Sequence, residues 1–390
     1  MRIAYVAPYQ GPGLLKTRPI LGNLGLAANV KMELVAELLR KNRHSVDLVS
    51  QGAVVERQVK FYPAFQEPTA FDQAIPVFYA SALPIRRING LWSALSTLRI
   101  LRRRHRLAPY DAVIIYNLQF PQVICAIYVM RVLGLPVVLE YEDDTFVSHD
   151  GKPSNDWNEG WHFRIVREIL NSVSGCTGVS PHLLSQVPST VPKVLLRGVV
   201  SEEILRLGLE AAKRKNWVVF SGTHFRTKGL EQLVAAWERV DLPDWELHIA
   251  GRGEKTDILQ KMAAHNKSIV FHGLLNREEN ARLLGRAKIG MNPHDISAKP
   301  GNVFAFKIIE YLGAGNHVIS TPMGALERDL EAGITYMPDN SPETIASTLQ
   351  RVIKDGHFRR TAKEAAEHAY GPAAVAKSLD ALLEQVRSRT

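Results

Sequence analysis

A lysine and a glutamate, Lys307 and Glu310, stand three residues apart in a segment whose apolar side chains recur at helical spacing. Residues three apart in a helix share a face, so the ammonium and the carboxylate are expected side by side. A carboxylate can accept hydrogen bonds from both vicinal hydroxyls of a ribose, and an ammonium can approach a phosphate. The pair therefore predicts a site for a ligand that carries phosphate and hydroxyls. The alternative is an exposed ion pair on an ordinary amphipathic helix.

The elements around this pair are a helix, a tight turn and a strand. The helix is expected within residues 302–315, and Gly313 and Gly315 are expected to stop it, because glycine tolerates the left-handed conformation. Residues 317–320 form a short, mostly apolar stretch, which is typical of a parallel strand covered on both faces.

A second strand-to-helix loop carries two further cations. Residues 217–221 predict a strand and residues 230–237 a helix, with Lys228 and Arg226 in the loop between them. Backbone amides in such a loop, together with the amino end of the helix, suit a pyrophosphate. Both cations are candidates for binding phosphate, and the alternative for Arg226 is a solvated loop charge.

Polar side chains follow two other expected strands, at 111–116 and 136–141. Carboxylates in this group could bind an acceptor hydroxyl or act as a general base, and the alternative is a role in ordering the loop or capping a helix. No set of histidine ligands accompanies them, so no metal site is expected. The candidate residues are Tyr116, Asn117, Glu140, Glu142, Asp143, Asp144 and, in the next loop, His149.

Length and composition limit the possible domain organisation and the possible partners of the chain. The chain has 390 residues, too many for one ordinary core, so two domains are expected. The two cysteines, Cys125 and Cys176, form no spacing motif and are expected to be buried thiols. The first residues predict a strand rather than a signal peptide, and no apolar run is long enough to cross a membrane. The formal charge of +9 favours anionic partners.

The pattern K-x-x-E-Y-L-x-A-G-x-x-V-I-S-T-P, which begins at Lys307, is followed by Met323, Gly324 and Glu327. It resembles the donor-site signature of retaining glycosyltransferases of the GT-B fold, family 4. The resemblance is strongest from about residue 217 to 340. It implies an α/β protein with two Rossmann-like domains that face each other across a cleft, and a C-terminal helix that crosses back. The expected domains are residues 1–200 on the acceptor side, 201–370 on the donor side and 371–390 for the crossing helix, with a linker at 201–215.

The resemblance also implies roles for individual residues. The catalytic candidates are Lys228, Arg226 and Glu310, with Lys228 on the donor phosphates and Glu310 on the ribose. The donor-binding candidates are Gly222, Thr223, Leu274, Asn302, Val303, Lys307 and Glu310. Three positions depart from the family pattern, since Asn302 replaces a glutamate, Thr223 an arginine and Tyr116 a histidine. Arg226 is expected to compensate for Thr223.

A basic segment lies apart from these motifs, at residues 90–106. Leu91, Trp92, Leu95, Leu98 and Leu101 follow a helical spacing, with arginines around them. A basic amphipathic helix with a tryptophan is typical of contact with an anionic membrane surface. The alternative is a helix packed in the core with a solvated arginine end. Nucleic acid is not expected, because no aromatic stacking pattern or helix-turn-helix signature accompanies the arginines.

The function that these patterns favour is transfer of a sugar, of the hexosyltransferase type, from a UDP- or GDP-linked donor to a glycan, lipid-linked or other cell-envelope acceptor. It would need no cofactor or metal, and it would take place in the cytoplasm or on the inner face of a membrane. Two alternatives remain open: a sugar-nucleotide epimerase on the same scaffold, and an inactive protein that binds a nucleotide sugar or a partner. A nicotinamide enzyme is disfavoured, because no G-x-G-x-x-G follows the first strand.

Overall fold

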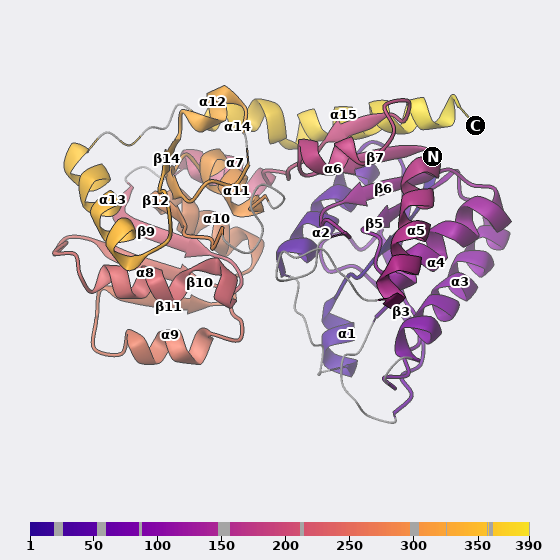
Figure 1. The fold of residues 1–390 in the computed structure, drawn as a ribbon, viewed down its shortest axis with the longest axis horizontal. Coiled ribbons are helices and arrows are strands. Elements are labelled where there is room, and N and C mark those ends of the chain that lie inside the picture. Colours follow the sequence, from indigo (N-terminus) through magenta and orange to yellow (C-terminus); the bar gives the residue numbers. More distant parts are fainter. Residues whose placement is uncertain are drawn as a thin grey trace. The chain divides into compact units, whose positions relative to one another are not determined.

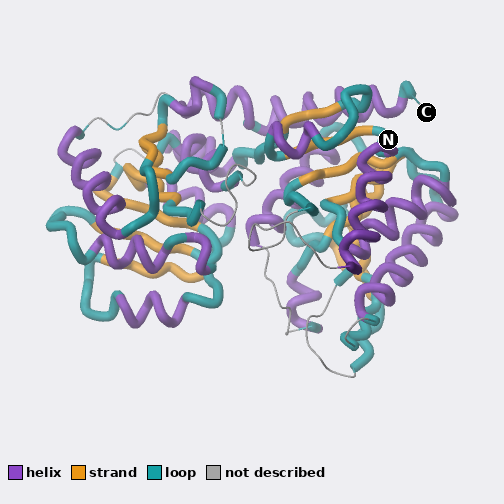
Figure 2. The backbone as a smooth tube through the Cα atoms, viewed as in Figure 1, coloured by secondary structure: helices purple, strands orange, loops and turns teal. Residues whose placement is uncertain are grey.

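A computed structural model gives the fold, and it describes residues 1–18, 26–52, 60–85, 88–146, 157–210, 214–296, 304–324, 326–356, 358 and 362–389. The chain forms two compact units (Figures 1 and 2). Unit 1 is Met1–Leu196 with Ala376–Thr390, and unit 2 is Arg197–Val375. The boundaries expected after residues 200 and 370 therefore lie close to those observed after residues 196 and 375.

Unit 1 is an α/β unit built on one sheet. Its strands are β1 (Arg2–Ala7), β2 (Ser45–Ser50), β3 (Phe65–Pro68), β4 (Pro76–Tyr79), β5 (Ala112–Tyr116), β6 (Val137–Tyr141), β7 (Gly175–Gly178) and β8 (Lys193–Leu195). Its helices are α1 (Pro12–Thr17), α2 (Leu26–Lys41), α3 (Asn89–Leu107), α4 (Phe120–Tyr128), the π-helix Val129–Leu133, α5 (Trp157–Ser172), α6 (Pro181–Ser185) and most of α15 (Pro372–Arg387).

The strands of unit 1 follow the order β3-β4-β2-β1-β5-β6-β7-β8. All neighbours are parallel except the pair β3 and β4. After β1 the chain builds outward first on one side, through β2, and then on the other side, through β5. The sequence predicts no element within residues 52–83, yet they hold β3 and β4. Both strands are four residues long, which explains why periodicity in the sequence did not show them.

The C-terminal helix α15 packs on the sheet of unit 1. A Cβ placed on Gly175 of β7 would lie 2.7 Å from Val386 and 3.2 Å from Leu382, so the absence of a side chain permits this close contact. Asp380 accepts hydrogen bonds from Asn42 at 2.7 Å and is bonded to His44 at 2.9 Å. The prediction that the last helix returns to the first domain is confirmed.

Unit 2 is a second α/β unit. Its strands are β9 (Lys215–Ser221), β10 (Glu246–Ala250), β11 (Ile269–Gly273), β12 (Ala287–Asn292), β13 (His317–Ser320) and β14 (Ile334–Tyr336). Its helices are α7 (Glu202–Glu210), a 3-10 turn at Arg226–Lys228, α8 (Leu230–Trp237), α9 (Thr256–Met262), α10 (Arg277–Arg286), α11 (Phe306–Ala314), α12 (Arg328–Glu331), α13 (Pro342–Asp355) and α14 (Ala362–Tyr370).

The sheet of unit 2 is parallel throughout, with the order β11-β10-β9-β12-β13-β14. Side chains of β9 alternate between two hydrophobic cores, because successive residues of a strand point to opposite faces. Val219 belongs to the core that α7, α10, α11 and α14 cover. Val218 and Phe220 belong to the core that α8, α9 and α13 cover. Figure 1 shows helices on both faces of this sheet.

Two expectations about this unit are wrong. The expected linker at 201–215 contains helix α7, whose Ile204 and Leu207 are buried in the core, so its many charges lie on the other face of an amphipathic helix. Gly313 does not stop the preceding helix but lies inside α11, where a Cβ would approach Val200 to 2.5 Å. Gly315 alone ends α11, with the left-handed φ of 77°.

Candidate functional site

The strand order of unit 2 defines where a ligand can bind. Strands β9 and β12 are neighbours, but the chain leaves β9 toward β10 on one side and leaves β12 toward β13 on the other. The chain thus reverses its direction of building between β9 and β12. The carboxyl edge at such a switch point, called the crevice below, is the usual ligand site of an open α/β sheet. Gly222 opens the loop after β9, and His294 stands in the loop after β12.

Hydrogen bonds to one backbone carbonyl connect the two loops. The carbonyl oxygen of Thr227 accepts one bond from the backbone N–H of Asp295 at 2.9 Å and another from Nδ1 of His294. Gly229, at a φ of 68°, lies so close to Pro293 that a Cβ would come within 1.8 Å of its carbonyl oxygen. This contact fixes the turn that carries Lys228, directly before helix α8.

Lys307, in the first turn of α11, points its ammonium at this crevice. Its Nζ is buried and has no hydrogen-bond partner among the described residues. It lies 3.5 Å from the ring centroid of Phe220, and a Cβ on Gly222 would come within 2.8 Å of it. Burial and the nearby Lys228 ammonium lower the pKa of Lys307 well below its usual value, with Glu310 opposing. A buried, unpaired ammonium beside a second cation favours an anionic ligand.

Glu310 follows Lys307 on the same face of α11. Burial raises the pKa of Glu310 to about 7, against the opposing effect of Lys307 and Arg277. The carboxylate forms no hydrogen bond or ion pair with another residue of the described segments. The alternative of an exposed Lys307–Glu310 ion pair is therefore wrong, since the ammonium is buried and no ion pair joins the two groups.

His294 adds a neutral imidazole to the crevice. The Thr227 carbonyl oxygen can only accept, so Nδ1 of His294 carries the proton and Nε2 keeps a free lone pair. Burial, the Lys228 ammonium and Lys307 lower the pKa of His294 to about 3, so the ring stays neutral at physiological pH. The ring can therefore accept a hydrogen bond from a ligand hydroxyl but adds no positive charge.

Tyr311 stabilises the floor of the crevice. Its hydroxyl accepts a hydrogen bond of 2.9 Å from the backbone N–H of Ser221, the last residue of β9. Its ring packs under Gly290, where a Cβ would lie 2.5 Å from the ring. Helix α11 is thereby held against the strands at the switch point, and this sets the position of Lys307 one turn earlier.

The other donor-side candidates are spread more widely. Thr223 lies beside Gly222 and is half-buried. Arg226 is exposed, and its backbone N–H donates to Glu254 at 3.3 Å. Leu274 follows the edge strand β11, two strands from β9, and is 49% exposed. Asn302 and Val303 lie outside the described residues.

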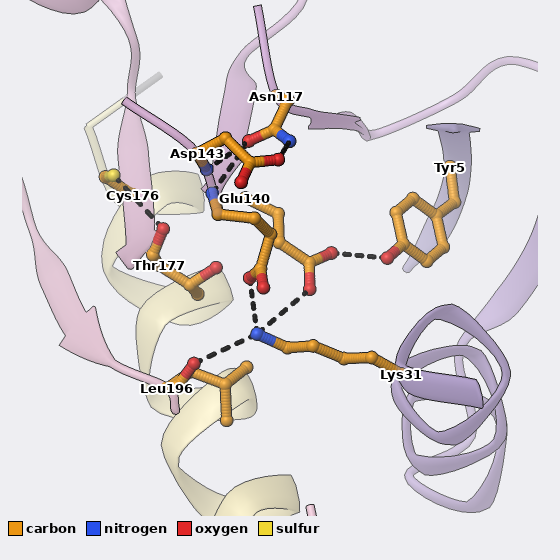
Figure 3. Close-up of polar contacts among 9 residues, drawn as sticks. Tyr5, Lys31, Asn117, Glu140, Asp143, Cys176, Thr177 and Leu196 are labelled. Atoms are coloured by element: carbon orange, nitrogen blue, oxygen red, sulfur yellow. Dashed lines mark hydrogen bonds and ion pairs between the residues drawn. The ribbon is translucent and has the colours of Figure 1, made fainter. Parts of the chain in front are cut away.

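In unit 1, Asn117 organises the loops after β5 and β6 (Figure 3). It has a left-handed φ of 57°. Its Oδ1 accepts from the backbone N–H groups of Glu142 at 2.7 Å and Asp143 at 3.1 Å. Its Nδ2 donates to the Asp143 carboxylate at 3.0 Å. The side chain thus bonds the backbone and side chain of the neighbouring loop, which fits the alternative of a role in ordering the loop. Both its oxygen and its nitrogen are already engaged, so it is poorly placed to bind an acceptor.

Lys31 of α2 contacts the acidic side chains of Glu140 and Glu142. Its ammonium is ion-paired with Glu142, lies 3.8 Å from Glu140 and donates to the carbonyl oxygen of Leu196 at 3.0 Å. Tyr5 donates to the other oxygen of Glu140, as Figure 3 shows. Burial raises the pKa of both carboxyl groups, and Lys31 opposes this. Glu142 is therefore already engaged by a buried cation.

Tyr116 ends β5 next to this network. Burial and the carboxylates of Glu142, Glu140 and Asp143 raise its pKa well above the usual value, so its hydroxyl keeps its proton. Asp144 lies apart, since it accepts from Gln186 at 3.1 Å and is bonded to His182 at 2.9 Å. His149 lies outside the described residues. Within the described segments, no cluster of three or more His, Cys, Asp or Glu side chains is arranged to hold a metal ion.

Comparisons with known proteins identify a family match in unit 2 and related folds for the whole chain. Residues 215–355 match the family described as glycosyl transferases group 1. No curated protein sequence matches the chain. The fold is shared with sucrose-phosphate synthase from Thermosynechococcus elongatus, at 15% identity and a TM-score of 0.71 over 100% of both chains.

Two further structures carry the same fold. HepE of Anabaena, solved in complex with UDP-glucose, has 16% identity and a TM-score of 0.65 over 98% of this chain and 99% of that one. A putative UDP-N-acetylglucosamine 2-epimerase from Listeria monocytogenes has 11% identity and a TM-score of 0.61 over 100% of this chain and 97% of that one. The chain thus has the GT-B fold, and residues 215–355 of its second unit match the family model of the group 1 glycosyltransferases.

Two residues of the site were not among the sequence candidates. His294 follows an expected strand, but nothing in the sequence showed that its Nδ1 would be tied to the loop of Lys228. Arg277, at the start of α10, lies near enough to Glu310 to lower its pKa and also bonds Glu203 at 3.3 Å. Both contacts join segments that are distant in sequence, so a short motif could not reveal them.

Proposed function

We propose that this protein is a retaining glycosyltransferase that uses a nucleoside diphosphate sugar as donor. The observation that carries the proposal is the buried, unpaired ammonium of Lys307 at the switch point of the unit that matches the glycosyltransferase family. Lys228 contributes a second positive charge beside it. A diphosphate supplies anionic oxygens to the unpaired Lys307 ammonium and to the neighbouring Lys228, and the ribose hydroxyls suit the carboxylate of Glu310.

The reaction follows from where charge develops. The bond between the anomeric carbon and the phosphate oxygen breaks, and negative charge builds on the departing diphosphate. Lys228 and Lys307 stabilise this charge, with Arg226 reaching in from the exposed turn. Preorganised donors of this kind are each worth roughly 3 kcal/mol of barrier. Cations of the chain itself take this role, so the proposed reaction needs no metal.

The acceptor hydroxyl attacks the anomeric carbon from the side that the phosphate leaves. Its proton passes to the departing phosphate, and the new glycosidic bond keeps the anomeric configuration of the donor. No carboxylate nucleophile is required, which agrees with the engagement of Glu142 by Lys31. The proposed acceptor is a glycan or a lipid-linked sugar of the cell envelope.

The first experiment is binding of a nucleotide panel, measured by calorimetry on the wild type, Lys307→Met and Glu310→Gln. UDP or GDP is expected to bind the wild type and to bind both variants at least tenfold more weakly. The matched control is Lys261→Met, which removes an exposed lysine of the same unit. Equal affinity in all four proteins would overturn the assignment of the site.

The second experiment separates transfer from the other activities that this scaffold could carry. The protein is incubated with the nucleotide sugar that binds best, with and without a pool of glycan and lipid-linked acceptors. Release of nucleoside diphosphate that depends on the acceptor supports transfer. Conversion of the sugar without any acceptor supports an epimerase. Binding with neither outcome supports an inactive binding protein, in line with the departures at Thr223, Asn302 and Tyr116.

A further inference from the structure

Helix α3 presents one exposed face that nothing in the described part of the chain covers. Its other face is buried, with Ala94, Thr97 and Leu101 inside unit 1. Trp92 belongs to that inner side, because its indole N–H donates to Ser81 at 3.1 Å. Figure 1 places α3 at the edge of unit 1, beside α4. One side of the helix is therefore packed against unit 1, and the other side is open.

Large apolar side chains gather at the amino end of the open face. Leu91 is 46% exposed and Leu95 is 45% exposed, and Ile88 precedes the helix with 47%. Phe61, 54% exposed, packs edge-on against Trp92. Single exposed apolar residues are ordinary, but four from two segments at one end of a helix face mark an interaction site.

Arginines continue the same face toward the carboxyl end of α3. The positions Leu91, Leu95, Arg99, Arg102 and Arg106 are spaced by four, four, three and four residues, which keeps them on one side of a helix. All three arginines are exposed, as is Arg103 at the edge of the face.

These charges are not neutralised from within the protein. Helix α3 contains no aspartate or glutamate. None of the four arginines forms an ion pair or hydrogen bond with another described residue. Arg104, on the inner side, does pair with Asp47 at 3.1 Å, so the helix itself distinguishes a structural arginine from the open ones.

We propose that this α3 surface docks the protein on an anionic lipid bilayer. The apolar group at the amino end enters the interface, and Arg99, Arg102, Arg103 and Arg106 lie against the anionic headgroups. Apolar residues at one end of a helix face and arginines at the other match the two layers of a membrane surface. An acidic protein or a nucleic acid would match the arginines but would leave the apolar group exposed. No described helix is long and apolar enough to cross a membrane, so the contact is a peripheral one.

The test is flotation of the full chain with vesicles of phosphatidylcholine, with and without phosphatidylglycerol, in the absence of nucleotide. Each arginine near an anionic surface contributes roughly fivefold to partitioning. Replacing Arg99, Arg102, Arg103 and Arg106 by glutamine is therefore expected to weaken binding to the anionic vesicles roughly 100-fold or more. High salt is expected to release the wild type, because exposed charges are screened.

A matched control removes the same charge from the other unit. Lys261, Lys267, Arg351 and Lys354 are exposed on unit 2, and their joint replacement by glutamine lowers the net charge equally. This control is expected to bind anionic vesicles as the wild type does. An equal loss in the control would show a general effect of net charge and would overturn the proposal.

The apolar part has its own variant, Leu91→Ser with Leu95→Ser, which is expected to weaken binding to anionic vesicles at least tenfold at low salt. No effect of this variant would overturn the proposed insertion. Arginine-dependent binding to RNA or DNA without binding to vesicles would overturn the choice of a membrane. Circular dichroism and UDP binding of each variant check that the fold persists. Vesicle binding does not depend on the nucleotide site, so it can succeed or fail independently of the proposed transferase activity.

Discussion

Each unit of this chain buries a lysine beside glutamates, and the two lysines have opposite surroundings. In unit 1, Lys31 is 3% exposed and is met by Glu142, Glu140 and the carbonyl oxygen of Leu196. In unit 2, the Nζ of Lys307 is equally hidden from solvent, but it has no hydrogen-bond partner among the described residues and lies over the ring of Phe220. One ammonium is neutralised by the protein, and the other is left unpaired.

The difference separates a structural charge from a functional one. A buried charge destabilises a fold unless it is paired, so an ammonium without a partner is retained at a cost in stability. Lys31 ties three segments of unit 1 together. Lys307 instead points into the crevice between the loops after β9 and β12, where a diphosphate could supply the missing partner. Substitutions at Lys31 and at Lys307 test this difference directly.

The largest expected effect is on the stability of unit 1. Lys31→Met leaves Glu140 and Glu142 buried without their cation and is expected to lower the free energy of unfolding by about 3–5 kcal/mol. Unfolding in guanidinium chloride measures the change. The triple variant that also carries Glu140→Gln and Glu142→Gln is expected to recover part of the loss. A loss below about 1 kcal/mol for Lys31→Met would remove the distinction between the two lysines.

The same substitution in unit 2 is expected to act on binding instead. Lys307→Met removes an unpaired buried charge, so the free energy of unfolding is expected to stay constant or rise by about 1 kcal/mol. Affinity for the nucleoside diphosphate is expected to fall by about 1.5–3 kcal/mol, the usual worth of a hydrogen bond to a charged group. Calorimetry and denaturant unfolding on one protein sample give both quantities. A stability loss as large as that of Lys31→Met would contradict the functional assignment.

A smaller effect is expected from a side chain added at Gly222, whose backbone packs against the ammonium of Lys307. Gly222 has a φ of 152°, and a Cβ there would lie 2.8 Å from Nζ. Gly222→Ala is expected to cost about 1–3 kcal/mol of stability and to weaken nucleotide binding by displacing the ammonium. The matched control is Gly356→Ala, where φ is 62° and no atom lies within 4 Å, so only about 1 kcal/mol of strain is expected, with normal nucleotide binding. Equal nucleotide affinity in both variants would show that the position of Lys307 does not depend on Gly222.

The smallest effect concerns pH. The pKa of Glu310 is raised from 4.5 to about 7, so between these values the folded protein binds more protons than the unfolded one. Stability is therefore expected to fall as pH rises from about 4.5 to 7. Glu310→Gln is expected to reduce this fall by about 1 kcal/mol, after allowance for partial solvent screening. Thermal unfolding across this pH range measures it, with the exposed Glu364→Gln as control. Parallel curves for wild type and Glu310→Gln would contradict the burial of a carboxylate at the site.

The regular elements were largely predictable from the sequence, because buried parallel strands and amphipathic helices depend on local patterns. Strand β13 and helix α8 have the bounds expected, and α15 lies within the expected residues 371–390. Errors occurred where a pattern was short or ambiguous. Strands β3 and β4 are too brief to show a period, and the charged face of α7 concealed its buried Ile204 and Leu207.

The chain alone therefore determined the α/β class, the two units, the helix that carries Lys307 and Glu310, and the loop that carries Lys228, because each depends on residues close together in sequence. Only the tertiary structure decided which charges are paired. Lys31 meets Glu142 across 111 residues, and His294 meets Thr227 across 67. Such contacts depend on strand order and loop packing, which no local pattern encodes. The same reason explains why Lys31 is neutralised by the fold while Lys307 is left without a partner.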